Sequence, residues 1–75
     1  MEPLQHLALR LGFDYISDLR YRSIPRSGEK VIRELSETDY SLHDYNECAQ
    51  YILDTKQQFS TIQDAKAAIL ERLRP

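Results

Sequence analysis

The stretch "SLHDYNECAQYIL", residues 41–53, carries the clearest fold signal in the chain. Ser41 followed three residues later by Asp44 resembles a capping box, with Asp in place of the preferred Glu, and predicts a helix from Leu42. Apolar side chains then recur every three or four residues, at Leu42, Tyr45, Cys48 or Ala49, and Ile52. This spacing gives an amphipathic helix one apolar face, about three turns long.

A second helix is predicted at the C-terminal end, after the interrupting stretch "DTKQQF" at residues 54–59. Ser60 with Gln63 forms a capping pair at its start. One face of this helix carries the apolar residues Ile62, Ala65, Ile69 and Leu73. Two neighbouring amphipathic helices bury their apolar faces against each other, so we expect an antiparallel helical hairpin.

The N-terminal half shows shorter helical patterns. In "EPLQHLALRL", residues 2–11, Pro3 suits a first turn, and Gly12 is expected to end the helix in the left-handed conformation. The apolar positions of this helix are Leu4, Leu7, Ala8 and Leu11. Asp14 is the expected N-cap of a short second helix through "YISDLRY", residues 15–21, with Ile16 and Leu19 inward.

The stretch "RYRSIPRSGEK", residues 20–30, is expected to be mostly a loop, because Pro25 and Gly28 interrupt the helical pattern. Within it, "YRSI" is a weak candidate for a short extended piece. "EKVIREL", residues 29–35, then restarts a helix that buries Val31, Ile32 and Leu35. We therefore predict an all-α fold, a small single-domain bundle of four or five short helices over residues 1–75.

Size and composition agree with that prediction. A chain of 75 residues forms one core and buries only about 60 to 65% of its unfolded surface, so its stability is modest. The single Cys48 cannot form an intramolecular disulfide, and no run of 18 apolar residues is present. We expect no membrane insertion and a reducing cytoplasm as the compartment.

Charge is distributed unevenly along the sequence. Residues 20–33 hold five basic side chains and one acidic one, a local sum of +4. Residues 34–54 hold six acidic side chains and no Lys or Arg, a local sum of −6 in a chain of net charge −2. Either the basic stretch pairs with the acidic one, or one of these patches meets a partner, where charge acts on association rate and specificity.

Residues 7–20, "LALRLGFDYISDLR", resemble the start of a helix-turn-helix, with Ala8 and Gly12 four residues apart. The pattern then departs from that motif, because Asp18 and Tyr21 stand where its second helix has apolar residues. The acidic pI of about 5.6 also differs from the basic footprint of most DNA-binding proteins. A nucleic-acid-binding accessory protein with a degenerate helix-turn-helix-like N-terminal half is therefore the alternative interpretation.

Catalysis and cofactor binding find little support in the sequence. "RSGEK" lacks the second glycine and the Ser or Thr of a phosphate-binding loop. His43 and Glu47 share a helix face, but one cysteine and two distant histidines do not supply the four ligands of a zinc site. No specific Ser, His and Asp arrangement is found, so we expect no enzyme activity, no cofactor and no metal.

The sequence thus predicts a non-catalytic protein-interaction or regulatory domain. Its partner is expected to be another protein or a second copy of the chain, with nucleic acid as the less favoured partner. The candidate partner-binding residues are Arg20, Arg22, Arg26, Lys30, Tyr21 and Tyr51. "RYRSIPRSGEK" is expected to pair with the acidic helix or with a protein partner, and not to hold nucleic acid.

Overall fold

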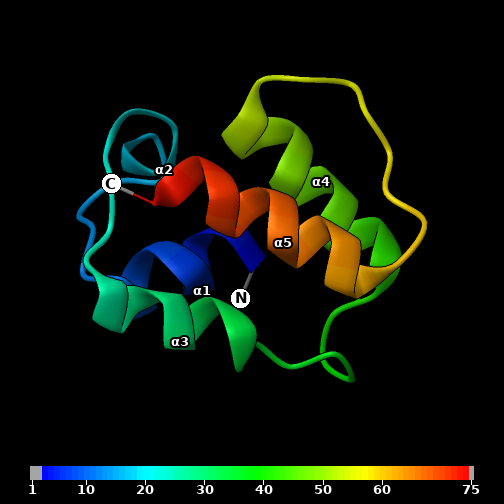
Figure 1. The fold of residues 1–75 in the computed structure, drawn as a ribbon, viewed down its shortest axis with the longest axis horizontal. Coiled ribbons are helices and arrows are strands. Elements are labelled where there is room, and N and C mark those ends of the chain that lie inside the picture. Colours follow the sequence, from blue (N-terminus) through cyan, green and yellow to red (C-terminus); the bar gives the residue numbers. More distant parts are fainter. Residues whose placement is uncertain (1–2, 75) are drawn as a thin grey trace.

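Helices follow one another along residues 3–74, the part of the chain that this computed structural model describes (Figure 1). They are α1 (Pro3–Arg10), α2 (Asp18–Tyr21), α3 (Arg26–Arg33), α4 (Leu42–Leu53) and α5 (Ile62–Leu73). These described residues contain no strand. The predicted all-α fold of four or five short helices is confirmed.

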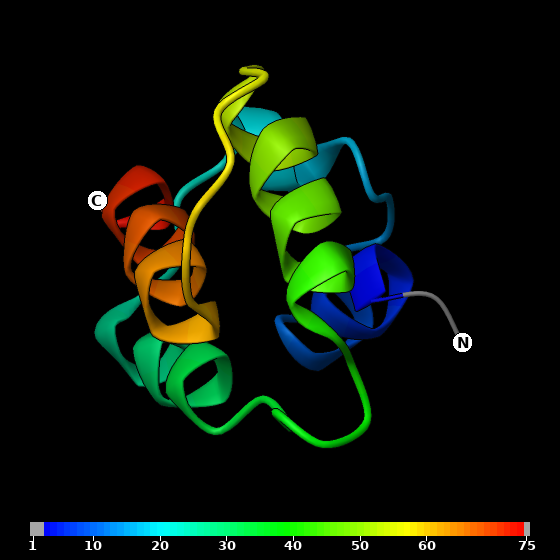
Figure 2. The ribbon, with the colours of Figure 1, turned by 90° about the vertical axis from the view of Figure 1, so that its right-hand side faces the viewer.

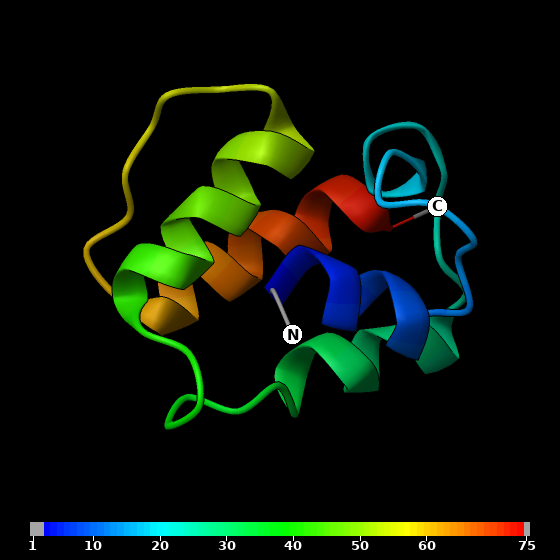
Figure 3. The same cartoon turned by 180° about the vertical axis from the view of Figure 1, so that it is seen from behind.

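The helices surround one cluster of buried side chains. Figure 2 shows α3 and α5 on one side, α1 and α4 on the other, and α2 across one end. Seen from behind, α1 lies close to α3 and α4, both of which it contacts (Figure 3). The largest fully buried side chains are Tyr45, Leu7, Leu19, Ile24, Ile32, Ile52, Ile69 and Leu73. Every helix and the link before α3 contribute to this set.

The pairing of α4 with α5 is confirmed, but their expected antiparallel direction is wrong. Figure 2 shows that both helices begin at the same side of the molecule and run in the same general direction. Side-chain contacts agree, because the Lys66 ammonium in the second turn of α5 lies 5.5 Å from the ring centroid of Tyr45 in the first turn of α4. The chain therefore crosses back along α4 before α5 begins.

Asn46 holds this returning segment, residues 54–61, against α4. Its amide oxygen accepts from the Phe59 backbone N–H at 2.7 Å, and its Nδ2 donates to the Phe59 carbonyl at 3.2 Å. Asn46 is only 9% exposed, so its amide lies in the protein and satisfies both backbone groups of Phe59. Instead of a short hairpin turn, α4 and α5 are joined by a segment that runs back along α4 and is held there by the buried Asn46 amide. Hydrophobic spacing does not indicate whether the chain runs back in this way, so the direction of α5 relative to α4 was predicted wrongly.

The end of α1 agrees with the sequence. Gly12 has a φ of +79°, which is the left-handed conformation expected there. The N–H of Phe13 donates to the Ala8 carbonyl at 2.9 Å, and that of Gly12 to the Leu9 carbonyl at 3.1 Å. These two bonds form a Schellman motif, which satisfies carbonyls at the end of the helix.

The second helix is shorter than predicted. It begins at Asp18, not after Asp14, and Ser17 precedes it. Backbone bonds from Asp18 to Tyr15 and from Leu19 to Ile16 make tight turns over residues 15–19. The Asp18 carboxylate also accepts from the Tyr15 N–H at 3.2 Å, which fixes a turn where the predicted helix would have begun.

The expectation that residues 20–30 are mostly a loop is wrong. Only residues 22–25 link α2 to α3, and α3 already begins at Arg26 after Pro25. Gly28 lies buried in the first turn of α3, where an added Cβ would come within 3.2 Å of Ile24 and 3.3 Å of Leu11. Its lack of a side chain permits close packing and does not end the helix. The "YRSI" segment forms no strand, although the Ile24 N–H donates to the Leu73 carbonyl at 2.9 Å.

The predicted start of α4 is confirmed and that of α5 is corrected. Ser41 and Asp44 form a complete capping box at the start of α4. Thr61, and not Ser60, caps α5, because its hydroxyl accepts from the Asp64 N–H at 3.1 Å. None of the helices described over residues 3–74 is long and apolar enough to cross a membrane.

Candidate binding groove between α3 and α5

Helices α3 and α5 run antiparallel, and three polar contacts along their length establish this direction. Glu29 in α3 accepts from Arg74 at 2.7 Å, where α5 ends. Lys66, in the second turn of α5, donates to the carbonyls of Arg33, the last residue of α3, and of Leu35, two residues beyond it. Gln63 in the first turn of α5 donates to Glu37, beyond the end of α3, at 2.6 Å. Polar pairs therefore connect the two helices at both ends.

Lys66 is the one buried cation among the described residues, with only 8% of its surface exposed. Its Nζ donates to the Leu35 carbonyl at 2.6 Å and to the Arg33 carbonyl at 3.3 Å, and the Glu37 carboxylate lies 3.8 Å away. Carbonyls at a helix C-terminus lack partners within the helix, and a lysine suits both them and the helix dipole. Lys66 therefore terminates α3 and ties it to α5.

A groove of about 380 Å³ lies between the two helices. Its apolar lining comes from Ala67 of α5, which is exposed, and from the buried Leu70 and Ile32, which are 7% and 0% exposed. Its polar residues are Arg33, Glu37, Gln63, Lys66 and Arg74. An apolar surface with a few charged groups at its edges is the usual construction of a binding site.

Three arginines surround one carboxylate at the Arg74 end of this groove. The hydrogen bond from Arg74 lowers the pKa of Glu29, and the positive charges of Arg33 and Arg26 act in the same direction. The Arg74 side chain is 45% exposed and that of Glu29 is 21% exposed. Glu71 also lies 3.4 Å from Arg74. Neither Arg26 nor Arg33 forms an ion pair with another described residue, so this end of the groove keeps positive charge for a ligand.

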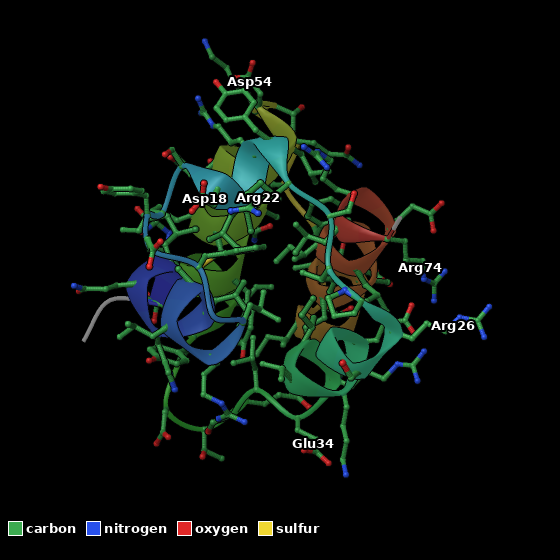
Figure 4. All side chains as sticks on the ribbon, turned by 90° about the vertical axis from the view of Figure 1, so that its left-hand side faces the viewer. Asp18, Arg22, Arg26, Glu34, Asp54 and Arg74 are labelled. Atoms are coloured by element: carbon green, nitrogen blue, oxygen red, sulfur yellow. The ribbon has the colours of Figure 1, made fainter. Side chains whose placement is uncertain are left out.

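Two of the predicted binding residues, Arg26 and Lys30, belong to this basic edge. Positions 26, 30 and 33 are four and then three residues apart, so their side chains share one face of α3. Lys30 forms only an exposed pair with Glu34, at 3.9 Å. Figure 4 shows Arg26 and Arg74 extending from the same edge of the molecule. We call the set Arg26, Lys30, Arg33 and Arg74 the basic edge of the groove.

Arg20 and Tyr51, also predicted for binding, instead contact each other at the end of α4. The Arg20 guanidinium lies 4.2 Å from the centre of the Tyr51 ring, and its Nε donates to the Tyr51 carbonyl at 2.7 Å. Asp54 lies 3.7 Å away and completes the cluster. The expected pairing of the basic stretch with the acidic one is thus made by Arg20, which fastens α2 to the end of α4.

Arg22 and Tyr21 lie on neither cluster. Tyr21 is 78% exposed, and the Arg22 guanidinium lies 5.9 Å from the centre of the Phe13 ring. Figure 4 places Arg22 over α2, away from Arg26. Phe13 also borders a second hollow of about 260 Å³ with the exposed Leu9 and Tyr15. The six predicted binding residues are therefore distributed over three places.

Cys48 lies in the core, and His43 lies on the surface beside a glutamate. Cys48 is 4% exposed, and burial raises the pKa of its thiol to about 12. His43 lies on the exposed face of α4, with its Nε2 3.2 Å from Glu47. Within residues 3–74, no three His, Cys, Asp or Glu side chains are grouped as metal ligands. Neither residue contributes to the groove.

Sequence reasoning missed the contribution of α5 to this site. Gln63, Ala67, Leu70 and Arg74 are spaced by four, three and four residues, with Lys66 next to Ala67, which makes a second stripe beside the apolar one. Lys66 stands among alanines and leucines in the helix sequence, and this position was the signal that could have indicated its burial. Nothing local in the sequence places Arg74 beside Glu29, because 45 residues separate them.

Comparison with known proteins identifies no relative of this chain. Protein-family models, curated proteins and solved structures were all compared with the chain, and none of them matches. The site is therefore interpreted from its own geometry and charge.

Proposed function

We propose that the protein is a non-catalytic interaction domain that binds a segment of another protein in the groove between α3 and α5. One observation carries this proposal: an apolar lining, exposed at Ala67 and closed beneath by the buried Ile32 and Leu70, borders a basic edge in which Arg26 and Arg33 have no ion pair within the described chain. Apolar contact supplies affinity and the charged edge supplies specificity and association rate.

The dimensions of the groove favour a peptide. The stripe from Gln63 to Arg74 spans eleven residue steps, about 16 Å at the helical rise of 1.5 Å per residue. About five residues of extended chain, or about three turns of helix, cover that length. A short segment of a protein partner therefore matches the groove from end to end.

Selection from a display library of random 12-residue peptides, followed by amide NMR on the full chain, tests the proposal. Peptides that bind should shift the amide signals of residues 29–37 and 63–74. The signals of residues 4–9 in α1 serve as the internal comparison, because none of these residues borders the groove. A library that gives no binder, or binders that shift only α1 and α2, would contradict the proposal.

Nucleic acid is the second candidate, because the same arginines suit phosphate groups. A helix-turn-helix mode of binding is disfavoured, because α2 offers few side chains that could contact DNA. It is a single turn of four residues, Leu19 is buried and Arg20 is held against α4. Labelled duplex and single-stranded DNA and RNA, titrated at low salt, separate the two candidates. Affinity tighter than about 10 µM that falls by about 0.9 log unit per phosphate contact for each log unit of salt would favour nucleic acid.

A further inference from the structure

We infer that the groove selects an acidic segment, whose carboxylate replaces Glu29 on Arg74 while a neighbouring apolar side chain packs on the exposed Ala67. This inference rests on the proposed function and names the chemistry of the partner. Its basis is the unequal charge of the two ends of the groove.

The Arg74 end of the groove is basic. Arg33 and Arg74 both border the groove there, and Arg26 lies on the same face of α3 as Arg33. Glu29 and Glu71 oppose these three cations, and Glu71 is the more exposed of the two, at 78% of its side chain. A carboxylate entering from outside meets an excess of guanidinium groups, which bind carboxylates with two parallel hydrogen bonds.

The opposite end of the groove carries Glu37. The carboxylate of Glu37 accepts from Gln63 at 2.6 Å and lies 3.8 Å from the buried Lys66. Two of the three ammonium hydrogens of Lys66 are used by the Arg33 and Leu35 carbonyls, and the residue is only 8% exposed, so it is poorly accessible to a ligand. The groove therefore changes along its length from an excess of positive charge to the neutral pair of Lys66 and Glu37, and a bound segment is oriented with its carboxylates at the Arg74 end.

Glu29 occupies the place that this partner carboxylate would take. It belongs to α3, yet it bonds to Arg74 at the end of α5 across the groove. Both side chains remain partly exposed, so solvent and ligands reach the pair. An incoming Asp or Glu competes with Glu29 for the same guanidinium, which makes Glu29 an internal competitor that lowers affinity.

The random-peptide selection described above tests this inference with two further readouts. Bound peptides should be enriched in Asp and Glu next to an apolar residue, and their affinity should fall as salt rises. Arg33→Gln should weaken their binding about two- to fivefold, the range of an exposed charge pair, whereas the matched exposed arginine change Arg10→Gln should leave it unchanged.

The direction in which Glu29→Gln changes peptide affinity is the most specific test, because this variant removes the competing charge but keeps the size of the side chain. It should tighten the binding of the same acidic peptides about two- to fivefold. Glu34→Gln removes an exposed carboxylate whose one ion pair within residues 3–74 is with Lys30, and it should change the affinity less. Both variants are first checked for helix content and for unchanged thermal unfolding midpoint to within a few degrees.

Failure of the inference and failure of the proposed function are distinguishable. Peptides that bind in the groove without acidic enrichment, or whose affinity Glu29→Gln leaves unchanged or weakens, would overturn the inference and leave the proposed function standing. Peptides that shift only amides outside α3 and α5 would overturn both.

Discussion

The ammonium group of Lys66 in α5 donates to the Leu35 carbonyl, two residues past the end of α3, at 2.6 Å. It also reaches the Arg33 carbonyl, and its nitrogen lies 5.5 Å from the ring centroid of Tyr45. A single side chain thereby joins α3, α4 and α5. The position of the groove depends on this contact, because the groove is the space left between two helices that Lys66 holds at a fixed separation.

Removing the Lys66 ammonium should destabilise the protein. Lys66→Met keeps most of the stem but leaves two carbonyls in a mostly buried site without their donor, which costs about 1 to 3 kcal/mol. Urea unfolding followed by circular dichroism measures this loss, and Lys56→Met, an exposed lysine in the segment before α5, is the control. Equal stabilities of the two variants would show that Lys66 is not needed to end α3.

The apolar contact between α4 and α5 should carry much of the stability. Ile52 is 2% exposed and Ile69 is 1% exposed. Either residue changed to Ala should lower the free energy of unfolding by about 2 to 4 kcal/mol, which largely unfolds so small a protein. Ala at the exposed Leu9 is the control. A loss below about 1 kcal/mol at both isoleucines would mean that α4 and α5 do not pack through them.

Tyr45 should make stability depend on alkaline pH. Its hydroxyl donates to the Ser36 carbonyl at 2.5 Å, and burial raises the pKa of Tyr45 to about 12 from its ordinary value of 10.0. A group whose pKa is raised on folding stabilises the protein fully below its unfolded pKa, and this contribution is lost as the pH rises through the folded pKa. The stabilising effect of Tyr45 should therefore disappear between pH 10 and 12.

Urea titrations of the wild type and of Tyr45→Phe between pH 8 and 11.5 measure this effect. At pH 8 the variant should be less stable by about 0.5 to 1.5 kcal/mol, the value of one hydrogen bond. Above pH 10 the difference should shrink, because only the wild type must keep Tyr45 protonated in order to fold. Cys48, whose pKa burial raises to about 12, ionises in both proteins and lowers the stability of each as the pH rises. A difference that stays constant with pH would contradict the assigned burial of the hydroxyl.

Local signals in the sequence predicted most of the helices and few of the contacts between them. Ser41 with Asp44, the left-handed Gly12 and the apolar stripe through Ile52 depend on neighbours within a few residues, and all three are confirmed. Gly28 was misinterpreted because a glycine ends a helix in one setting and permits close packing in another. Only its contacts with Ile24 and Leu11 distinguish the two.

The candidate groove was harder to predict, because it is assembled from distant residues. Arg26 and Lys30 were among the predicted binding residues, but Arg74 and Lys66 join them only through the packing of α5 on α3. Arg20 and Tyr51 carried the same charge and aromatic signals and yet form an internal contact. Composition identifies such residue types, whereas the fold decides which of them face a partner.

Filling the groove tests the central claim most directly. Ala67 is exposed and borders the groove, so Ala67→Trp places an indole in the binding space without entering the core. Gln58→Trp, in the exposed segment between α4 and α5, adds the same side chain elsewhere. With peptides selected on the wild type, our account predicts that Ala67→Trp raises Kd by about tenfold or more, equal to at least about 1.4 kcal/mol, and that Gln58→Trp leaves it unchanged. Equal Kd values for the wild type and Ala67→Trp would contradict binding in the α3–α5 groove.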